Sequence, residues 1–146
     1  EKGGEFTMQE KNGLAIFKNN CASCHTEPLF TNNEFHNNGL TLDPYLKDFG
    51  RMLITNKSED SLKFKVPTLR NIQFTPPYMH DGRFETLKAV ITHYNSGITH
   101  SITLAEDLKN NLELTHKEEV DLLVFLRTLT DKEFLFNNRF SYPHIN

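Results

Sequence analysis

The sequence predicts a mainly α-helical domain with long irregular loops. Two capping boxes, T-M-Q-E at 7–10 and T-H-K-E at 115–118, each precede a segment with a helical apolar pattern and so mark a helix start. Between them, residues 26–73 are rich in Asn, Gly, Asp and Pro, a composition typical of loops. The only two cysteines stand in C-A-S-C-H at 21–25, and C-x-x-C-H is the attachment signature of c-type haem. A bound haem would replace part of the core, so we expect the loops to wrap around it.

The bulk composition is that of a single globular domain. The chain has 146 residues, of which 37% are hydrophobic and 24% charged, which suffices for one core. Its net charge of −3 favours neither nucleic acid nor an anionic membrane surface, and no apolar run approaches the length of a membrane span. Covalent haem attachment takes place outside the cytoplasm, so we expect a periplasmic, exported protein. Because the chain starts at Glu1 without an initiator methionine, we expect it to be part of a longer one.

The spacing of the cysteine motif has a chemical reason. Cys21 and Cys24 are three residues apart, so on a helical turn both sulfurs face the same way and can form thioethers with one porphyrin. His25 then follows as the proximal ligand of the iron. A structural zinc site would need a second Cys or His pair, and a dithiol redox pair would follow a strand in a βαβ unit. Neither context is visible, so one covalent haem c is the favoured cofactor.

Four helical segments are expected. The first begins after Thr7 and carries Gly13 and Phe17 on one face, and the last follows Thr115 with a broad apolar face. We expect these two helices to cross at Gly13, the alternative being a mid-helix glycine that costs about 1 kcal/mol. A second helix is expected at about 83–94, and a short one around 104–110. The domain organisation follows: 1–6 as the remnant of an interdomain connection, 7–133 as the haem domain and 134–146 as a C-terminal extension.

Several motifs resemble a known family. G-x-x-x-F-x-x-x-C-x-x-C-H at 13–25 resembles the N-terminal helix of class I cytochromes c. F-K-V-P-T-L-R-N at 64–71 and T-P-P-Y-M-H-D-G at 75–82, with F-H-N-N-G at 35–39 and D-F-G-R at 48–51, resemble the C-terminal haem domain of bacterial dihaem cytochrome c peroxidases. That superfamily includes the MauG-type enzymes. The resemblance covers nearly the whole chain and implies a class I cytochrome c-like fold.

The resemblance also implies a division of labour. In the family, an N-terminal haem domain reacts with hydrogen peroxide, and a C-terminal haem domain accepts electrons from a small donor protein. This chain has one C-x-x-C-H and therefore corresponds to the electron-accepting half of a peroxidase or MauG-like oxidase. The partners implied are the N-terminal peroxidatic domain, absent here, the electron donor, and a second copy, since the family commonly pairs. The alternatives are a free-standing monohaem cytochrome c electron carrier and a zinc or redox module without haem.

The sixth ligand of the iron is open between several residues. In the resemblance, the position of the family's distal ligand falls at Tyr94, which would match the MauG-type arrangement. Met79 is the alternative, because a thioether is a familiar partner of a His-ligated haem. His80, His93 or no ligand at all are also compatible with the sequence. Without a ligand role, Met79 would fill a core gap and Tyr94 would be an aromatic with a hydrogen-bonded hydroxyl.

Further polar residues are candidates for the cofactor's surroundings. Arg70 and Arg51 could pair with the haem propionates through bidentate hydrogen bonds, or could be solvated surface arginines. His36 and His80 could form hydrogen bonds near the haem edge or at the domain interface, but a histidine whose hydrogen bonds are satisfied within the protein is the favoured interpretation of both. The resemblance further implies a calcium ion held by the backbone carbonyls of Thr75 and Pro77, with a third ligand from the absent domain.

Overall fold

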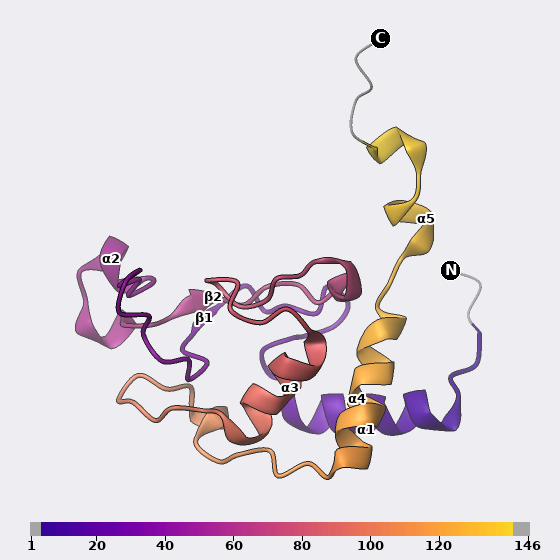
Figure 1. The fold of residues 1–146 in the computed structure, drawn as a ribbon, viewed down its shortest axis with the longest axis horizontal. Helices are drawn as coiled ribbons and strands as arrows, with labels where there is room; N and C mark the ends of the chain where they lie inside the picture. Colours follow the sequence, from indigo (N-terminus) through magenta and orange to yellow (C-terminus); the bar gives the residue numbers. More distant parts are fainter. Residues whose placement is uncertain (1–3, 142–146) are drawn as a thin grey trace.

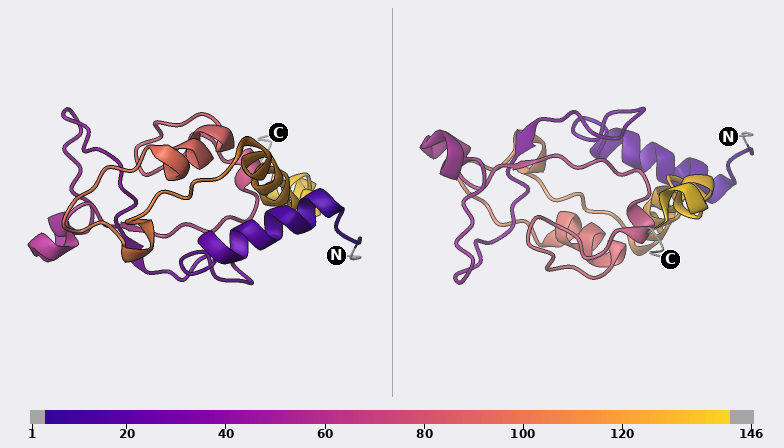
Figure 2. Two further views of the ribbon diagram at one scale, coloured as in Figure 1. Left: turned by 90° about the horizontal axis from the view of Figure 1, so that it is seen from below. Right: turned by 90° about the horizontal axis from the view of Figure 1, so that it is seen from above.

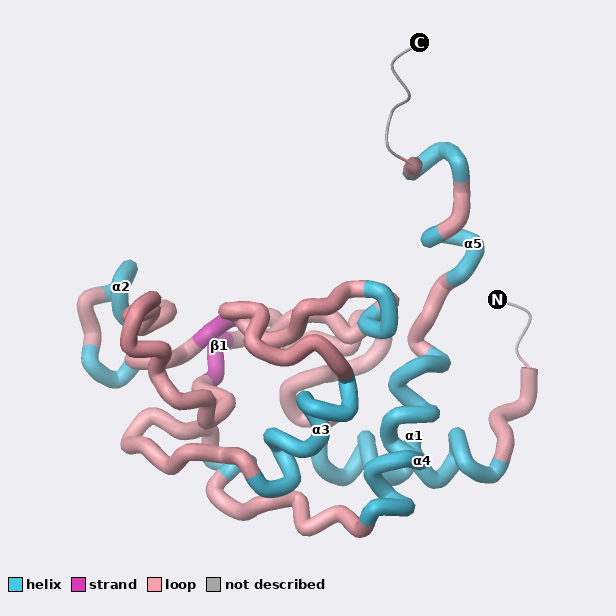
Figure 3. Tube along the Cα trace, in the orientation of Figure 1, coloured by secondary structure: helices cyan, strands magenta, loops and turns pink. Residues whose placement is uncertain are grey.

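The computed structural model describes residues 4–141, and its regular elements are mainly helices joined by long loops (Figures 1 and 3). This confirms the predicted mainly α-helical class. The elements in chain order are α1 Met8–Asn20, β1 Phe35–His36, α2 Met52–Thr55, η1 Ser58–Asp60, β2 Phe64–Lys65, η2 Ile72–Phe74, α3 Leu87–Ser96, η3 Glu106–Leu108, α4 His116–Thr128, α5 Lys132–Leu135 and η4 Asn138–Phe140.

The crossing of α1 and α4 forms the centre of the core (Figure 1). Both predicted capping boxes are present, so each helix starts where its local sequence predicted. At the crossing, a Cβ atom on Gly13 would meet the Asp121 carbonyl group and lie 2.7 Å from Phe125 Cβ. The Phe17 ring packs against Phe125 with centroids 5.2 Å apart. The predicted close approach at Gly13 is therefore confirmed.

The helix α3 begins later than the sequence suggested. Thr86 is its N-cap and accepts a hydrogen bond from the Ala89 backbone, so the helix starts at Leu87 rather than near residue 83. The preceding Arg83 is held outside the helix, where its guanidinium pairs with Asp81. The helix also runs on to Ser96, so Tyr94 lies within its last turn.

The other short segments are weaker than regular helices. Only the 3₁₀ turn η3 forms in the segment expected to be helical at 104–110. Beyond α4, the chain forms α5 and η4, which extend away from the crossing helices in Figure 1. Residues 1–3 of the expected interdomain remnant and residues 142–146 of the expected extension lie outside the described residues.

Long loops connect the helices to two short antiparallel strands of two residues each. Strand β1 pairs with β2 in the register Phe35 with Lys65 and His36 with Phe64. In both views of Figure 2, α1 and α3 lie on opposite sides of these loops, with α2 at the end away from α4. Over residues 4–141, no helix is both long and apolar enough to cross a membrane.

Asn37, in the F-H-N-N-G motif, holds several loops together. Its side chain is 1% exposed, and its amide nitrogen donates to the Ser101 hydroxyl at 3.0 Å and the Thr103 hydroxyl at 2.9 Å. Its amide oxygen accepts from the Gly39 backbone at 2.9 Å. Gly39 has a φ of 74° and lies against Ile98, so a side chain there would be strained and crowded. The motif therefore anchors the loop after β1 to the segment that follows α3.

Candidate functional site

One internal cavity of about 390 Å³ brings most of the predicted site residues together. It is bounded by the C-terminal end of α1, by α3 and α4, and by the loops around β2 and residues 75–80. Much of the wall is apolar, with side chains such as Leu69, Ile91 and Leu126. The predicted site residues that line it are Cys21, Cys24, His25, Thr75, Pro77, Met79 and Tyr94.

His25 is oriented by a backbone carbonyl. It lies in the turn after α1, where its backbone nitrogen donates to the Cys21 carbonyl at 2.9 Å. Its ring Nδ1 is 3.1 Å from the Phe30 carbonyl oxygen, so Nδ1 carries the proton and Nε2 keeps its lone pair. Burial lowers the pKa of His25, against the opposing effect of carbonyls of Phe30 and Pro67. A neutral imidazole with a free Nε2 and a carbonyl behind Nδ1 is the form that ligates a metal.

The two cysteines continue the last turn of α1. The Cys21 backbone nitrogen donates to the Phe17 carbonyl at 2.8 Å, and both thiols are free and reach the cavity. Burial raises the pKa of Cys21 to about 12, and burial also raises that of Cys24. Reactive redox thiols need a lowered pKa, so these thiols lack the electrostatics of a dithiol redox pair.

Among residues 4–141, no three His, Cys, Asp or Glu side chains come together in a way that could hold a metal ion. A structural zinc ion needs four such ligands. The C-x-x-C-H motif is therefore arranged along the wall of a cavity rather than around a point.

Tyr94 and Met79 both reach the cavity, from different elements. Tyr94 comes from α3, and burial raises its pKa to about 12, with a hydrogen bond from the Asn38 side chain acting in the opposite direction. Met79 comes from the turn before α3 and has a φ of 73°. Its sulfur is 3.4 Å from the Asn38 Nδ2 atom, which donates to it. The two candidate ligands thus share one polar neighbour.

The cavity also has polar lining residues that no spacing rule indicated. Asn38 and Lys65 both line it, and the Lys65 ammonium donates to the Val66 carbonyl at 3.3 Å. Asn38 belongs to F-H-N-N-G and Lys65 to F-K-V-P-T-L-R-N, two motifs that the sequence singled out, but the sequence contained no signal for which member faces inward.

The two histidines expected near the cofactor edge also line the cavity. His36 Nε2 is 3.2 Å from a Glu34 carboxylate oxygen. The His80 ring stacks on Phe64, with centroids 3.6 Å apart and an interplanar angle of 12°. Both rings therefore have a partner within the protein: a carboxylate for His36 and an aromatic ring for His80.

The structure does not bring Arg51 and Arg70 to the cavity wall. The Arg51 guanidinium lies 4.4 Å from the centre of the Phe35 ring, and its Nε is 3.4 Å from an Asp60 carboxylate oxygen. Arg70 is exposed. The Arg51 guanidinium instead contacts Phe35 and Asp60, which come from other parts of the chain.

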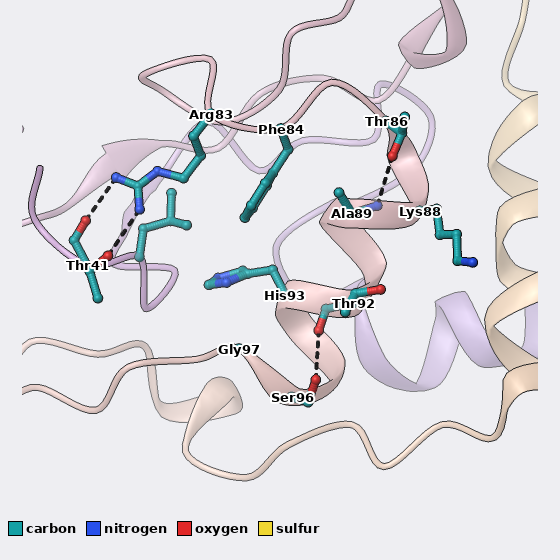
Figure 4. Close-up of a pocket in the computed structure, with 11 residues that line it drawn as sticks. Thr41, Arg83, Phe84, Thr86, Lys88, Ala89, Thr92, His93, Ser96 and Gly97 are labelled. Carbon is teal, nitrogen blue, oxygen red and sulfur yellow. Dashed lines mark hydrogen bonds between the residues drawn. The ribbon is translucent and has the colours of Figure 1, made fainter.

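A second, more open hollow of about 600 Å³ lies along α3 (Figure 4). Arg83 donates from Nη2 to the Thr41 carbonyl at 2.9 Å and from Nη1 to the Thr41 hydroxyl at 3.2 Å. His93 lines this hollow, whereas its neighbour Tyr94 lines the internal cavity. The His93 Nε2 atom donates to the Asn38 carbonyl at 2.9 Å, which ties α3 to the loop after β1.

Known proteins resemble this chain in both sequence and structure. It is 38% identical over 135 residues to the methylamine utilization protein MauG of Methylophilus methylotrophus, a match that covers 87% of this chain and 39% of that protein. It is 30% identical over 156 residues to a cytochrome-c peroxidase of Denitromonas iodatirespirans, covering 88% of this chain and 41% of that protein. No protein-family model matches the chain.

A solved structure agrees with these relatives. The crystal structure of a MauG-like protein associated with microbial copper homeostasis superposes with a TM-score of 0.77 and 33% sequence identity, covering 95% of this chain and 52% of the other. The fold is thus that of a MauG-like protein. The chain belongs to the family of the MauG proteins and cytochrome c peroxidases. It spans about two fifths of the length of the curated relatives it matches.

Proposed function

We propose that this chain is a c-type haem electron-transfer domain, with the haem in the internal cavity. The observation that carries the proposal is the arrangement of the C-x-x-C-H residues: Cys21, Cys24 and His25 line one cavity, and His25 keeps Nε2 free because Nδ1 donates to a carbonyl. In this role the two thiols would form the thioethers and His25 would be the proximal ligand. The haem supplies reversible one-electron chemistry, and the protein sets its potential through ligands, burial and hydrogen bonds.

The residues present fit that cofactor better than the alternatives. The wall combines apolar side chains with a few polar groups, as expected for a bound porphyrin. The raised pKa values of Cys21 and Cys24 disfavour a thiolate redox pair, and the described residues contain no cluster that suits zinc. Lys65, His36 and His80 are among the side chains at the wall that could form hydrogen bonds with the propionates.

For the sixth ligand we favour Tyr94, with Met79 as the alternative. Both side chains line the cavity, and Tyr94 stands at the position where the resemblance places the family's distal ligand. A tyrosine oxygen favours ferric iron, whereas a methionine sulfur raises the potential. The identity of this residue therefore decides the redox behaviour of the domain.

Within a longer protein, we propose that the chain is the C-terminal, electron-accepting half of a dihaem cytochrome c peroxidase or MauG-like oxidase. The proposal is supported by relatives of both names and by the fact that the chain spans only part of their length. Its partners would be an N-terminal peroxidatic haem domain and a small electron-donor protein in the periplasm. A calcium ion between the domains would use the carbonyls of Thr75 and Pro77.

The primary test is the absorption spectrum of the chain produced with a c-type haem maturation system. We expect a Soret band that survives acid–acetone extraction, because a thioether-bound haem stays with the protein. The double variant Cys21→Ala, Cys24→Ala should lose that resistance while His25 is retained. A wild-type chain without a Soret band would refute the haem proposal.

The sixth ligand is tested by a pair of substitutions. Tyr94→Phe should change the ferric spectrum strongly, because it removes the oxygen ligand while keeping the ring. Met79→Leu should leave the ferric spectrum close to that of the wild type. The reverse pattern would assign the position to Met79.

The alternative function, a free-standing electron carrier, has a separate test. In the dihaem proposal, the isolated chain exchanges electrons but does not turn over hydrogen peroxide, and the encoding gene carries a second C-x-x-C-H domain upstream. Peroxide turnover by the isolated chain would contradict its assignment as the electron-accepting half. A gene that encodes only this haem motif would favour the carrier.

A further inference from the structure

The histidine before Tyr94 ties the last turn of α3 to the loop after β1. His93 is 6% exposed, and its Nε2 atom donates to the Asn38 carbonyl at 2.9 Å. Its ring leaves α3 toward Phe84, with the two ring centroids 5.7 Å apart (Figure 4). The neighbouring Asn37 anchors the accepting loop with three hydrogen bonds, so the carbonyl that His93 binds belongs to a segment that is itself held in place.

The asparagine after Tyr94 ties the same turn to the beginning of α4. Asn95 Nδ2 donates to the Leu114 carbonyl at 3.0 Å and to a Glu119 carboxylate oxygen at 2.9 Å. Its Oδ1 atom accepts from the Leu114 backbone nitrogen at 2.7 Å. Because α4 crosses α1, and the C-x-x-C-H residues follow α1, the Asn95 side chain connects the turn of Tyr94 to the part of the wall that holds His25.

Together the two ties restrain the rotation of this turn. Successive residues of an α-helix point about 100° apart, so His93 and Asn95 leave the helix on either side of Tyr94. His93 accordingly lines the open hollow, whereas Tyr94 lines the internal cavity. The last turn of a helix frays easily, because its final carbonyls lack partners within the helix. Tyr94 lies two residues before the end of α3 at Ser96, so its direction depends on contacts outside the helix.

We propose that His93 and Asn95 are positioning residues that hold Tyr94 at the haem site. The inference rests on the proposed haem function, in which Tyr94 is the distal ligand, and each of the two residues acts through the turn that carries it. A binding group must keep its geometry within about 0.5 Å, and a phenol oxygen at the end of a long side chain moves further than this when its turn rotates. The sequence H-Y-N at 93–95 thus forms one unit, a ligand between two restraints.

The test uses the haem-loaded chain with His93→Leu, with Asn95→Ala and with both changes. Each single variant should shift the ferric spectrum toward that of Tyr94→Phe and raise the reduction potential, because the oxygen ligand favours ferric iron, and the double variant should shift both further. Losing these hydrogen bonds should change the ratio of bound to released Tyr94 by roughly fivefold to thirtyfold. Ser96→Ala, at an exposed position of the same turn, is the matched control and should leave spectrum and potential unchanged.

A conservative variant separates positioning from a general loss of stability. His93→Gln keeps an N–H donor near the position of Nε2, so it should retain the wild-type spectrum and potential even where its Tm is lower. Equal spectral shifts in His93→Gln and His93→Leu would refute the role of the hydrogen bond to Asn38. Asn95→Ala tests the second restraint independently, should His93→Leu not fold.

The failure of this inference differs from the failure of the haem proposal. If His93→Leu and Asn95→Ala both keep the wild-type spectrum and potential while Tyr94→Phe changes them, the positioning role is overturned and the haem proposal stands. If Tyr94→Phe changes nothing, the ligand itself is assigned wrongly and the inference falls with it. A wild-type chain without a Soret band would instead refute the haem proposal.

Discussion

Replacing Gly13 by alanine tests the helix crossing on which the cavity depends. A Cβ atom at this position would lie 2.7 Å from Phe125 Cβ and would also meet the Asp121 carbonyl. Ordinary carbon–carbon contacts are about 3.5–4.0 Å, so α1 would have to move away from α4 by about 1 Å. Because both contacts involve the backbone or the first atom of a side chain, no rotamer change can relieve them.

The cost follows from what is buried at the crossing. Phe17 is 0%, Phe125 2% and Leu122 3% exposed, and full burial of such a side chain contributes about 1.5–3 kcal/mol. A gap of about 1 Å forfeits roughly a quarter to a half of the contact energy, which gives a loss of about 3 kcal/mol for the three side chains. Alanine regains about 1 kcal/mol of helix propensity. We therefore expect Gly13→Ala to lower the free energy of unfolding by about 2 kcal/mol, or the Tm by about 4–8 °C.

Urea unfolding followed by far-UV circular dichroism measures this change. Ala15→Gly, at an exposed position of the same helix, is the matched control and isolates the propensity contribution of about 1 kcal/mol. If Gly13→Ala instead stabilised the protein by about that amount, the close crossing would be refuted and Gly13 would be an ordinary mid-helix glycine.

Three further substitutions test other parts of the structure. Asn37→Ala should lower the free energy of unfolding by about 3 kcal/mol, since it removes a buried side chain that makes three hydrogen bonds of 2.9–3.0 Å; a loss below about 1 kcal/mol in urea unfolding would contradict this. Arg51→Ala should cost no more than about 1 kcal/mol, because its contacts with Asp60 and the Phe35 ring are at the surface. It should also leave the reduction potential of the loaded chain unchanged, whereas a large shift would restore Arg51 as a propionate partner. Hydrogen bonds from Thr115 lower the pKa of Glu118 from its ordinary value of 4.5, so its contribution to stability is present above that pH and is lost as the pH falls through the folded-state pKa. Tm measured from about pH 6 to about pH 3 should therefore fall less for Glu118→Gln than for the wild type, and equal slopes would argue against the capping role.

The parts of the structure that could be predicted are those with a local physical cause. A capping box involves residues three apart, so the starts of α1 and α4 could be read directly from the chain. The sequence predicted a start of α3 near residue 83, whereas Thr86 supplies the N-cap and the helix begins at Leu87. Arg51 could not be assigned from the sequence, because neither Phe35 nor Asp60 is marked as its partner until the loops are folded.

The sequence by itself determined which groups follow α1: two thiols and an imidazole, at the spacing of a c-type haem attachment motif. It also determined the two helices that cross at Gly13, because a capping box and a small residue on a helix face are both local features of the sequence. Only the tertiary structure decided which other side chains line the cavity together with His25. Tyr94, Met79 and Asn38 come from α3, from the turn before it and from the loop after β1. Their meeting depends on loop packing between residues far apart in the chain, which no local pattern encodes.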